Sequence, residues 1–195
     1  MRALRTALPL AIVCLLIGIQ SAFSQAWKVE GGSQLRFTFL QQGSPVEGRF
    51  GKFTADITFD PHHLSKSLFE VEIDTSSIDT GHKDRDTLLR SSNFFYVEMW
   101  PMAQFASGPI RHKGGNAYET DGRLTVRGVT RNVLLPFSLV IGEQSGTPGR
   151  ERAVAKGELT ISRLDYGIGQ GEWASTKTVG DQVVIAFEIR ASRKR

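Results

Sequence analysis

Apolar and polar residues alternate at every second position through most of this chain. Leu35, Phe37 and Phe39 are separated by single polar residues, and seven further stretches repeat the pattern. Because successive side chains of a β-strand point to opposite faces, a period of two indicates strands with one buried face. Strands are expected at residues 35–39, 53–59, 69–73, 101–105, 118–126, 133–139, 153–161 and 183–189, after a short strand at 27–30.

The connections between these stretches are mostly short, and segments 41–45 and 145–149 carry the Gly, Pro and Ser of turns. Short connections favour hairpins and therefore antiparallel order. A sheet of eight such strands loses its exposed edges by closing on itself. The pattern predicts an all-β fold, an eight-stranded antiparallel up-and-down β-barrel. Its interior is wide enough for side chains or for one slender ligand.

The alternation gives way to a short helical segment between residues 79 and 95. Asp84 and Asp86 lie early and Arg90 lies late in this segment, which suits a helix dipole, and Asp79 or Thr80 is a candidate cap. The helix is expected to cover the barrel mouth with its charges outward. Its inward apolar side chains are then Leu88, Leu89, Phe94 and Phe95.

The first residues have the pattern of a secretory signal peptide. Arg2 and Arg5 precede an apolar run at residues 7–19, which is too short to span a membrane. Small residues before Gln25 predict cleavage there, with Ser24-Gln-Ala26 as a second option, and this divides the chain into a signal peptide at 1–24 and one domain at 25–195. The alternative is an N-terminal helix that is buried or anchored in a membrane. A signal peptide implies a periplasmic or secreted protein, and the one cysteine, Cys14, would leave with it.

The net charge is +4, and part of it lies in the basic C-terminal residues 190–195. A solvated terminus accounts for this tail. The alternative is a weak, peripheral attraction to anionic lipid headgroups. Charges elsewhere alternate in sign without a basic stripe, so nucleic acid is not an expected partner.

The histidines do not form a metal site in the sequence pattern. His62 and His63 are adjacent and point to opposite faces of an extended segment, and His82 and His112 are isolated. Without a cysteine in the mature chain, neither a zinc site nor another metal site is expected. No cofactor is expected, because the glycines of segment 167–171 are not followed by the long helix of a dinucleotide site.

No specific catalytic constellation is present, and the protein is not expected to be an enzyme. The cluster Asp84-Arg85-Asp86 lacks a partner nucleophile or base, so a structural role on the short helix is favoured. An enzyme acting on a small lipid stays open as an alternative that would depend on Asp74, Asp79 and Arg85.

Aromatic and aliphatic residues dominate the inward faces of the predicted strands and helix. They can form an ordinary packed core, or together line an elongated apolar cavity that binds a ligand. The predicted lining comprises Phe37, Phe39, Phe53, Ile57, Phe59, Phe69, Val71, Ile73, Leu88, Phe94, Phe95, Phe105, Leu124, Val126, Leu135, Phe137, Tyr166, Trp173, Ile185 and Phe187.

Five segments resemble the YceI-like polyisoprenoid-binding proteins, secreted bacterial proteins with a lipocalin-like barrel. They occur in the family's order and cover most of the mature chain. The segments are Val46-Glu-Gly-Arg-Phe50, Ile73-Asp-Thr-Ser-Ser-Ile-Asp-Thr80, Arg85-Asp-Thr-Leu-Leu-Arg-Ser-Ser-Asn-Phe94, Trp100-Pro-Met-Ala-Gln-Phe-Ala-Ser107 and Gly122-Arg-Leu-Thr-Val-Arg-Gly-Val-Thr-Arg-Asn-Val133. The resemblance implies that the barrel holds a long isoprenoid lipid, such as a polyprenyl chain or the tail of an isoprenoid quinone.

The chain departs from the family pattern at two positions. Family members often carry a histidine where this chain has Leu40 or Gln41, and another where it has Leu88. A role of those histidines at a polar headgroup therefore does not carry over. The variant Gln41-Gln42-Gly43 resembles a branch associated with membrane b-type cytochromes, which makes such a cytochrome an expected partner. The alternative function is a stress-response or interaction module whose barrel is filled and takes no ligand.

Overall fold

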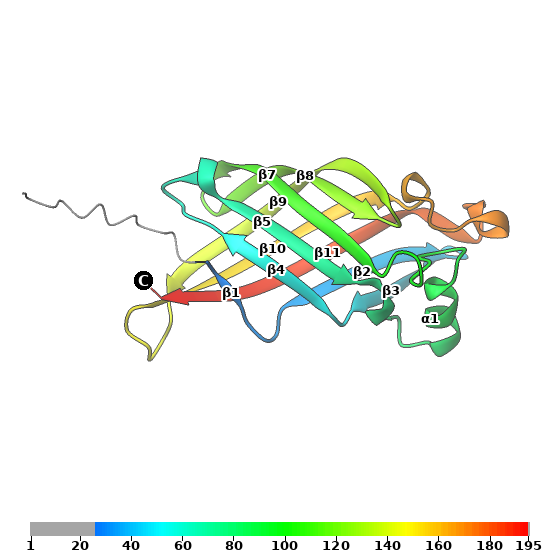
Figure 1. Cartoon of the computed structure of the whole chain (residues 1–195), viewed down its shortest axis with the longest axis horizontal. Coiled ribbons are helices and arrows are strands. Elements are labelled where there is room, and N and C mark those ends of the chain that lie inside the picture. Colours follow the sequence, from blue (N-terminus) through cyan, green and yellow to red (C-terminus); the bar gives the residue numbers. More distant parts are fainter. Residues whose placement is uncertain (1–25, 195) are drawn as a thin grey trace, which may run out of the picture.

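Antiparallel β-strands wound into a barrel make up most of the structure, a computed structural model that describes residues 26–194 (Figure 1). The strands are β1 (Lys28–Val29), β2 (Gln34–Gln41), β3 (Ser44–Phe50), β4 (Phe53–Thr58), β5 (Leu68–Asp74), β6 (Ile78–Asp79), β7 (Met102–Gly114), β8 (Ala117–Val126), β9 (Val129–Glu143), β10 (Arg150–Ser162) and β11 (Val179–Lys194). The helices are α1 (Lys83–Arg90) and four short 3-10 helices, η1 (Leu64–Lys66), η2 (Thr75–Ser77), η3 (Leu164–Tyr166) and η4 (Gly171–Ala174). The signal peptide predicted at residues 1–24 lies outside the described residues.

The strands succeed one another in the order β4-β5-β7-β8-β9-β10-β11-β2-β3-β6, and neighbours are antiparallel. β1 also pairs with β11, beyond the start of β2, and Trp27 next to it bridges to Ile57 of β4. β1 and β2 therefore occupy one position around the barrel. The segments β3 and β4 share a second position in the same way, and β5 and β6 share a third. The predicted antiparallel β-barrel is confirmed. The strand count differs, because eleven strand segments share eight positions around the barrel.

β3 is the longest strand that the sequence pattern did not predict. The turn before it is only Gln42 and Gly43, both with positive φ (50° and 77°), so residues 44 and 45 already belong to the strand. The middle inward position of β3 is Gly48. A Cβ there would lie 2.3 Å from the ring of Phe37, because that ring covers the glycine. An aromatic residue on β2 thus fills the space that an apolar side chain of β3 would fill, which hides the alternation.

Pro136 of β9 lies where a ladder of the sheet ends. β9 is an interior strand paired with β8 and β10, but its pairing with β10 stops at Phe137 and Gly157. A Cβ on Gly157 would lie 2.6 Å from the carbonyl oxygen of Pro136, so the two backbones meet closely at this point. Beyond it β9 and β10 separate, and η3 lies against both of them.

The apolar interior divides into two clusters along the barrel. One lies at the end that carries α1, η3 and η4, which we call the helix end. The other lies around Trp27, Phe59 and Ala191, near the last residues of β11, which we call the Trp27 end. Figure 1 shows α1 and the orange loops after β10 at one end of the barrel, and β1 and the C-terminus at the other.

The helix α1 lies within the predicted helical segment 79–95 but covers only Lys83–Arg90, and its charges are not all outward. Asp86 is buried, and its carboxylate accepts hydrogen bonds from the amide (2.8 Å) and the hydroxyl (2.6 Å) of Thr80. Neither Asp79 nor Thr80 is the cap, because His82 occupies the N-cap position without a side-chain hydrogen bond. Arg90 donates to the carbonyl oxygens of Ser76 (2.8 Å) and Ile78 (2.6 Å), which fixes the helix to β6.

Candidate functional site: an apolar cavity in the barrel

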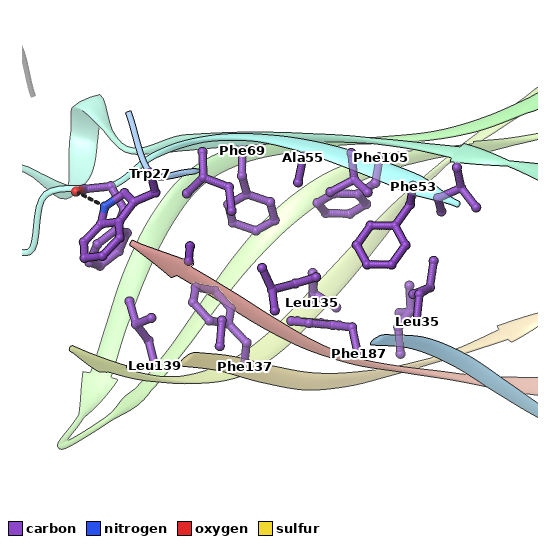
Figure 2. Close-up of a pocket in the computed structure, with 18 of the residues that line it drawn as sticks. Trp27, Leu35, Phe53, Ala55, Phe69, Phe105, Leu135, Phe137, Leu139 and Phe187 are labelled. Atoms are coloured by element: carbon purple, nitrogen blue, oxygen red, sulfur yellow. Dashed lines mark hydrogen bonds between the residues drawn. The ribbon is translucent and has the colours of Figure 1, made fainter. Parts of the chain in front are cut away.

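An apolar cavity of about 150 Å³ lies inside the barrel. Figure 2 shows two facing rows of side chains along it, with Phe69, Ala55 and Phe53 in one row and Leu139, Phe137 and Leu35 in the other. The complete lining is Trp27, Leu35, Phe53, Ala55, Ile57, Phe59, Phe69, Val71, Ile73, Phe105, Leu124, Leu135, Phe137, Leu139, Ala153, Ala155, Leu159, Ile185, Phe187, Ile189 and Ala191. All of these side chains are apolar apart from the indole N–H of Trp27.

The space exists because small residues occupy inward positions on neighbouring strands. Ala153 of β10 is the register partner of Ala191 of β11, and Ala155 lies two positions further along the same face. Ala55 of β4 lines the cavity as well. A Leu or Phe at these positions would fill a volume that the surrounding backbone cannot close, because interiors are otherwise close-packed. The alternation of β10 therefore creates a hollow rather than a filled core.

Stacked aromatic rings form the firmer part of the wall. The ring of Phe69 lies 5.6 Å from that of Phe105 and 5.9 Å from that of Phe137. Phe137 stacks in turn on Tyr118 at 5.6 Å, and Tyr118 meets Phe59 edge-on at 5.7 Å. Pairs of this kind contribute about 0.5–1.5 kcal/mol beyond their burial. They hold the ring of Phe59, just after β4, and the rings of β5, β7, β8 and β9 against one another around the hollow.

The Trp27 end of the cavity is closed by directed interactions. The indole N–H of Trp27 donates to the carbonyl oxygen of Phe59 at 3.0 Å, the dashed line in Figure 2. The guanidinium of Arg193 lies 4.4 Å from the centre of the Trp27 ring and donates to the same carbonyl at 2.9 Å. Arg193 also pairs with Glu151 at 2.8 Å. One tryptophan is thereby fixed from two sides.

The helix end of the barrel is filled. Phe37 and Phe39 stack at 6.2 Å, Phe50 meets Phe95 edge-on at 5.8 Å, and Phe94 lies 5.6 Å from Trp173. The segment 79–95 was expected to cover a cavity mouth. It instead contributes Phe94 and Phe95 to this layer of rings, and none of its residues lines the cavity.

The residues predicted to line a cavity fall into two groups in the structure. One group lines it: Phe53, Ile57, Phe59, Phe69, Val71, Ile73, Phe105, Leu124, Leu135, Phe137, Ile185 and Phe187. The other group lies in the packed helix end, away from the cavity, because the loops there supply enough aromatic volume to fill the barrel: Phe37, Phe39, Leu88, Phe94, Phe95, Val126, Tyr166 and Trp173.

Several lining residues were missing from the sequence prediction. Leu35, Leu139, Leu159 and Ile189 share the inward face of residues that were predicted, so the alternation alone could have found them. The alanines also share these inward faces, and their small side chains leave the space that the larger residues surround. Trp27 precedes a two-residue strand, which is too short to show a period.

No ionisable side chain lines the cavity, but the packed end holds several that are buried, among them Arg163 and Tyr166. Arg163 is 2% exposed and donates to the carbonyl oxygens of Ile168 (2.7 Å), Val179 (2.8 Å) and Gly180 (2.9 Å). Desolvation lowers the pKa of its guanidinium, and the charge of Asp181 opposes this. Desolvation likewise raises the pKa of the buried Tyr166. The three carbonyls show that Arg163 fixes the loop of residues 163–180.

The residues of the enzyme alternative do not meet at the cavity. Asp74 accepts from the amide (2.9 Å) and the hydroxyl (2.5 Å) of Ser76, and Asp79 pairs with Arg49 at 2.7 Å. Arg85 lies on α1 at the filled end. Residues 26–194 contain no group of three or more His, Cys, Asp or Glu that could hold a metal ion. No helix in that part of the chain is long and apolar enough to cross a membrane.

The fold and the cavity define an antiparallel barrel with a hollow apolar half. The family model of the YceI-like domain matches residues 27–191, and the chain belongs to this family. A UPF0312 protein of Pectobacterium carotovorum is 34% identical over 188 residues, which cover 94% of this chain and 96% of that protein. The resemblance found in the five sequence segments is thereby confirmed.

Solved structures agree with the fold. The crystal structure of Burkholderia cenocepacia BcnA matches with a TM-score of 0.74 and 32% identity, covering 82% of this chain and 96% of that one. A polyisoprenoid-binding domain from Saccharophagus degradans matches with a TM-score of 0.63 over 85% of this chain and 97% of that one. The second match is 15% identical and supports the fold alone.

Proposed function

We propose that this protein is a non-catalytic binding protein that holds the apolar chain of an isoprenoid lipid, a polyprenyl chain or a quinone tail, inside its barrel. The observation that carries the proposal is the cavity, whose lining is apolar throughout and includes no ionisable side chain. Such a surface offers burial but no group for acid–base or nucleophilic chemistry. The family supports binding rather than catalysis, and the domain of Saccharophagus degradans with the same fold is described as polyisoprenoid-binding.

Affinity would come from chain length. Each methylene moved from water into an apolar site contributes about 0.8 kcal/mol, so several isoprene units suffice without a polar contact. The present cavity of about 150 Å³ is the size of an engineered core cavity that binds benzene, about 150 Å³. It therefore accommodates one segment of a chain. A longer chain requires rings in the wall to change rotamer.

We place the protein in the periplasm or outside the cell, on the basis of the signal-peptide pattern in residues 1–24. A carrier in that compartment would shield an apolar chain from water between membranes. The proposal does not extend to a membrane b-type cytochrome, for which neither the fold nor the relatives give support. The positive φ of Gln42 and Gly43 accounts for that segment as a tight turn.

The test is lipid extraction followed by uptake. Protein purified from its own host is extracted with organic solvent for mass spectrometry, and ligand-free protein is titrated with a benzoquinone bearing a four-isoprene tail. Ala155→Phe fills the cavity and is expected to lower the affinity at least tenfold. Ala117→Phe, on the exposed face of β8, is the control and leaves the affinity unchanged. Lipid-free protein that also takes up no quinone would establish the filled-barrel module instead.

A further inference from the structure

The barrel wall is interrupted at one place beside the cavity. The β2–β3 ladder ends at Arg36 and Arg49, and the next pair that joins the same two sides is Trp27 and Ile57. Within residues 26–194, no ladder pair joins segment 28–35 to segment 50–56. Each segment forms its hydrogen bonds with its neighbour on the opposite side. The amide of Glu30 donates to the carbonyl oxygen of Arg190, and the amide of Gly51 donates to that of Ser77. We call this interruption the side gap.

The side gap leads toward the cavity. A hollow of about 510 Å³ occupies it, lined by Val29, Glu30, Gly31, Gly32, Ser33, Gly51, Lys52, Phe53, Thr54, Glu72, Asp74 and Met102. Phe53 lines both this hollow and the apolar cavity. Figure 2 shows its ring facing Leu35 across the cavity, at the end away from Trp27. The half-buried ring of Phe53 is therefore what separates the cavity from the side gap.

The other routes into the cavity are more strongly closed. At the Trp27 end, Trp27 and Arg193 are joined to Phe59 by hydrogen bonds and to each other by ring contact. At the helix end, the rings of the packed cluster fill the barrel. At the side gap no backbone hydrogen bond has to break, because the wall has none there. Phe53 is the residue that lines both the hollow and the cavity at this point.

The charged residues that line the hollow disfavour an anionic headgroup within it. Glu30 is neutralised by Arg152 at 3.0 Å. Glu72 accepts from the amide of Gln104, Asp74 accepts from Ser76, and neither carboxylate forms an ion pair within residues 26–194. Lys52 is the one cation among the residues that line the hollow. A diphosphate needs several Arg or Lys donors, whereas a hydroxyl or a quinone carbonyl can be met by one ammonium group and hydroxyls such as that of Thr54.

We propose that the side gap is the port through which the apolar chain enters the barrel and the site where an uncharged headgroup, a hydroxyl or a quinone, remains bound, with Phe53 as the gate. This inference rests on the proposed function. It names what that function leaves open, the headgroup class and the route. The glycines fit the assignment, because Gly31 and Gly51 keep the two rims of the gap free of side chains.

The route is tested by the rate of quinone uptake in stopped-flow tryptophan quenching. Gly31→Trp obstructs the side gap without strain, because Gly31 has no positive φ and no atom lies within 4 Å of an added Cβ. The matched control is Ala117→Trp, an exposed position of β8, which pairs with β7 and β9 and not with the strands beside the gap. Gly31→Trp is expected to slow uptake at least tenfold, Ala117→Trp to leave it unchanged, and Phe53→Ala to accelerate it. Quinone uptake by Gly31→Trp at the wild-type rate would overturn the assignment of the side gap as the entry port.

The headgroup is tested by displacing the bound quinone with geranylgeraniol or with geranylgeranyl diphosphate, which share one apolar chain. The alcohol is expected to bind at least tenfold more tightly than the diphosphate, and Glu72→Gln to narrow the difference. Equal or tighter binding of the diphosphate would overturn the headgroup assignment. Failure of the proposed function looks different, because the wild-type protein would then take up no quinone in either experiment.

Discussion

The two ends of the barrel are built from the same strands and the same alternation, yet one end is filled and the other is hollow. At the helix end, the turn after α1 and the loop of residues 163–180 add Phe94, Phe95, Tyr166 and Trp173 to the inward side chains of the strands. At the Trp27 end no loop contributes that much aromatic volume, and Ala153, Ala155 and Ala191 leave space. Alternation decides which face is buried. Side-chain size and the connections decide whether the buried face is packed.

The difference assigns distinct roles to the two ends. The packed end carries the interactions that fix the fold, including three carbonyls on the buried Arg163 and the hydrogen bonds that join α1 to β6. The hollow end is less closely packed, because the side chains around unfilled space lose dispersion contacts there. A cavity that is retained at this cost is consistent with a ligand-binding half supported by a rigid half.

The largest expected effect comes from removing a ring at the packed end. Phe94 is 3% exposed, so Phe94→Ala creates a new cavity and is expected to lower the free energy of unfolding by about 3–5 kcal/mol. Phe53→Ala only enlarges an existing hollow and removes a half-buried ring, so a loss of about 1 kcal/mol is expected. Urea unfolding of both variants measures the difference. Equal losses would contradict the distinction between the two ends.

A smaller effect, of opposite sign at the two ends, is expected when a buried alanine is enlarged. Ala103 is buried in the packed cluster, and Ala103→Val is expected to destabilise by about 1–3 kcal/mol through overpacking. Ala153 faces the cavity, and Ala153→Val is expected to stabilise by up to about 1 kcal/mol, because two methyl groups enter empty space. Thermal unfolding of the ligand-free proteins compares them. A destabilising Ala153→Val would show that the hollow is smaller than its lining indicates.

The sequence was sufficient for the barrel because alternation is a local signal that each strand repeats. It failed at β3, where Gly48 lies under the ring of Phe37 and the apolar residue is supplied by another strand. It failed at Asp86, whose burial depends on the hydroxyl of Thr80 in the loop before the helix. In both cases the missing information is the contact between two segments, which no periodicity contains.

The site was predictable only in part, for the same reason. Phe37 and Phe187 have the same inward pattern, but Phe37 stacks in the packed cluster and Phe187 lines the cavity. What separates them is the size of the residues across the barrel, which sequence spacing does not give. The side gap was hidden altogether, because it depends on where two ladders end.

The smallest expected effect is on the pH dependence of stability, and here the two ends should behave alike. The hydrogen bond from His63 lowers the pKa of Asp60 near the Trp27 end. Hydrogen bonds from Gly81 and then Arg49 lower the pKa of Asp79 at the helix end. Because both folded pKa values lie below the unfolded value of about 3.9, each carboxylate contributes stability above that pH and loses it as the pH falls through its folded pKa.

Asp60→Asn and Asp79→Asn are therefore each expected to be slightly less stable than the wild type at pH 7 and to converge with it as the pH falls from the unfolded value of about 3.9 through the folded pKa of each carboxyl, as urea midpoints measured across this range would show. Both carboxylates are on the surface, where such interactions are weak and screened by salt. If one variant alone converged, charge as well as packing would distinguish the two ends. If both converge, the contrast between the filled and the hollow end rests on side-chain volume.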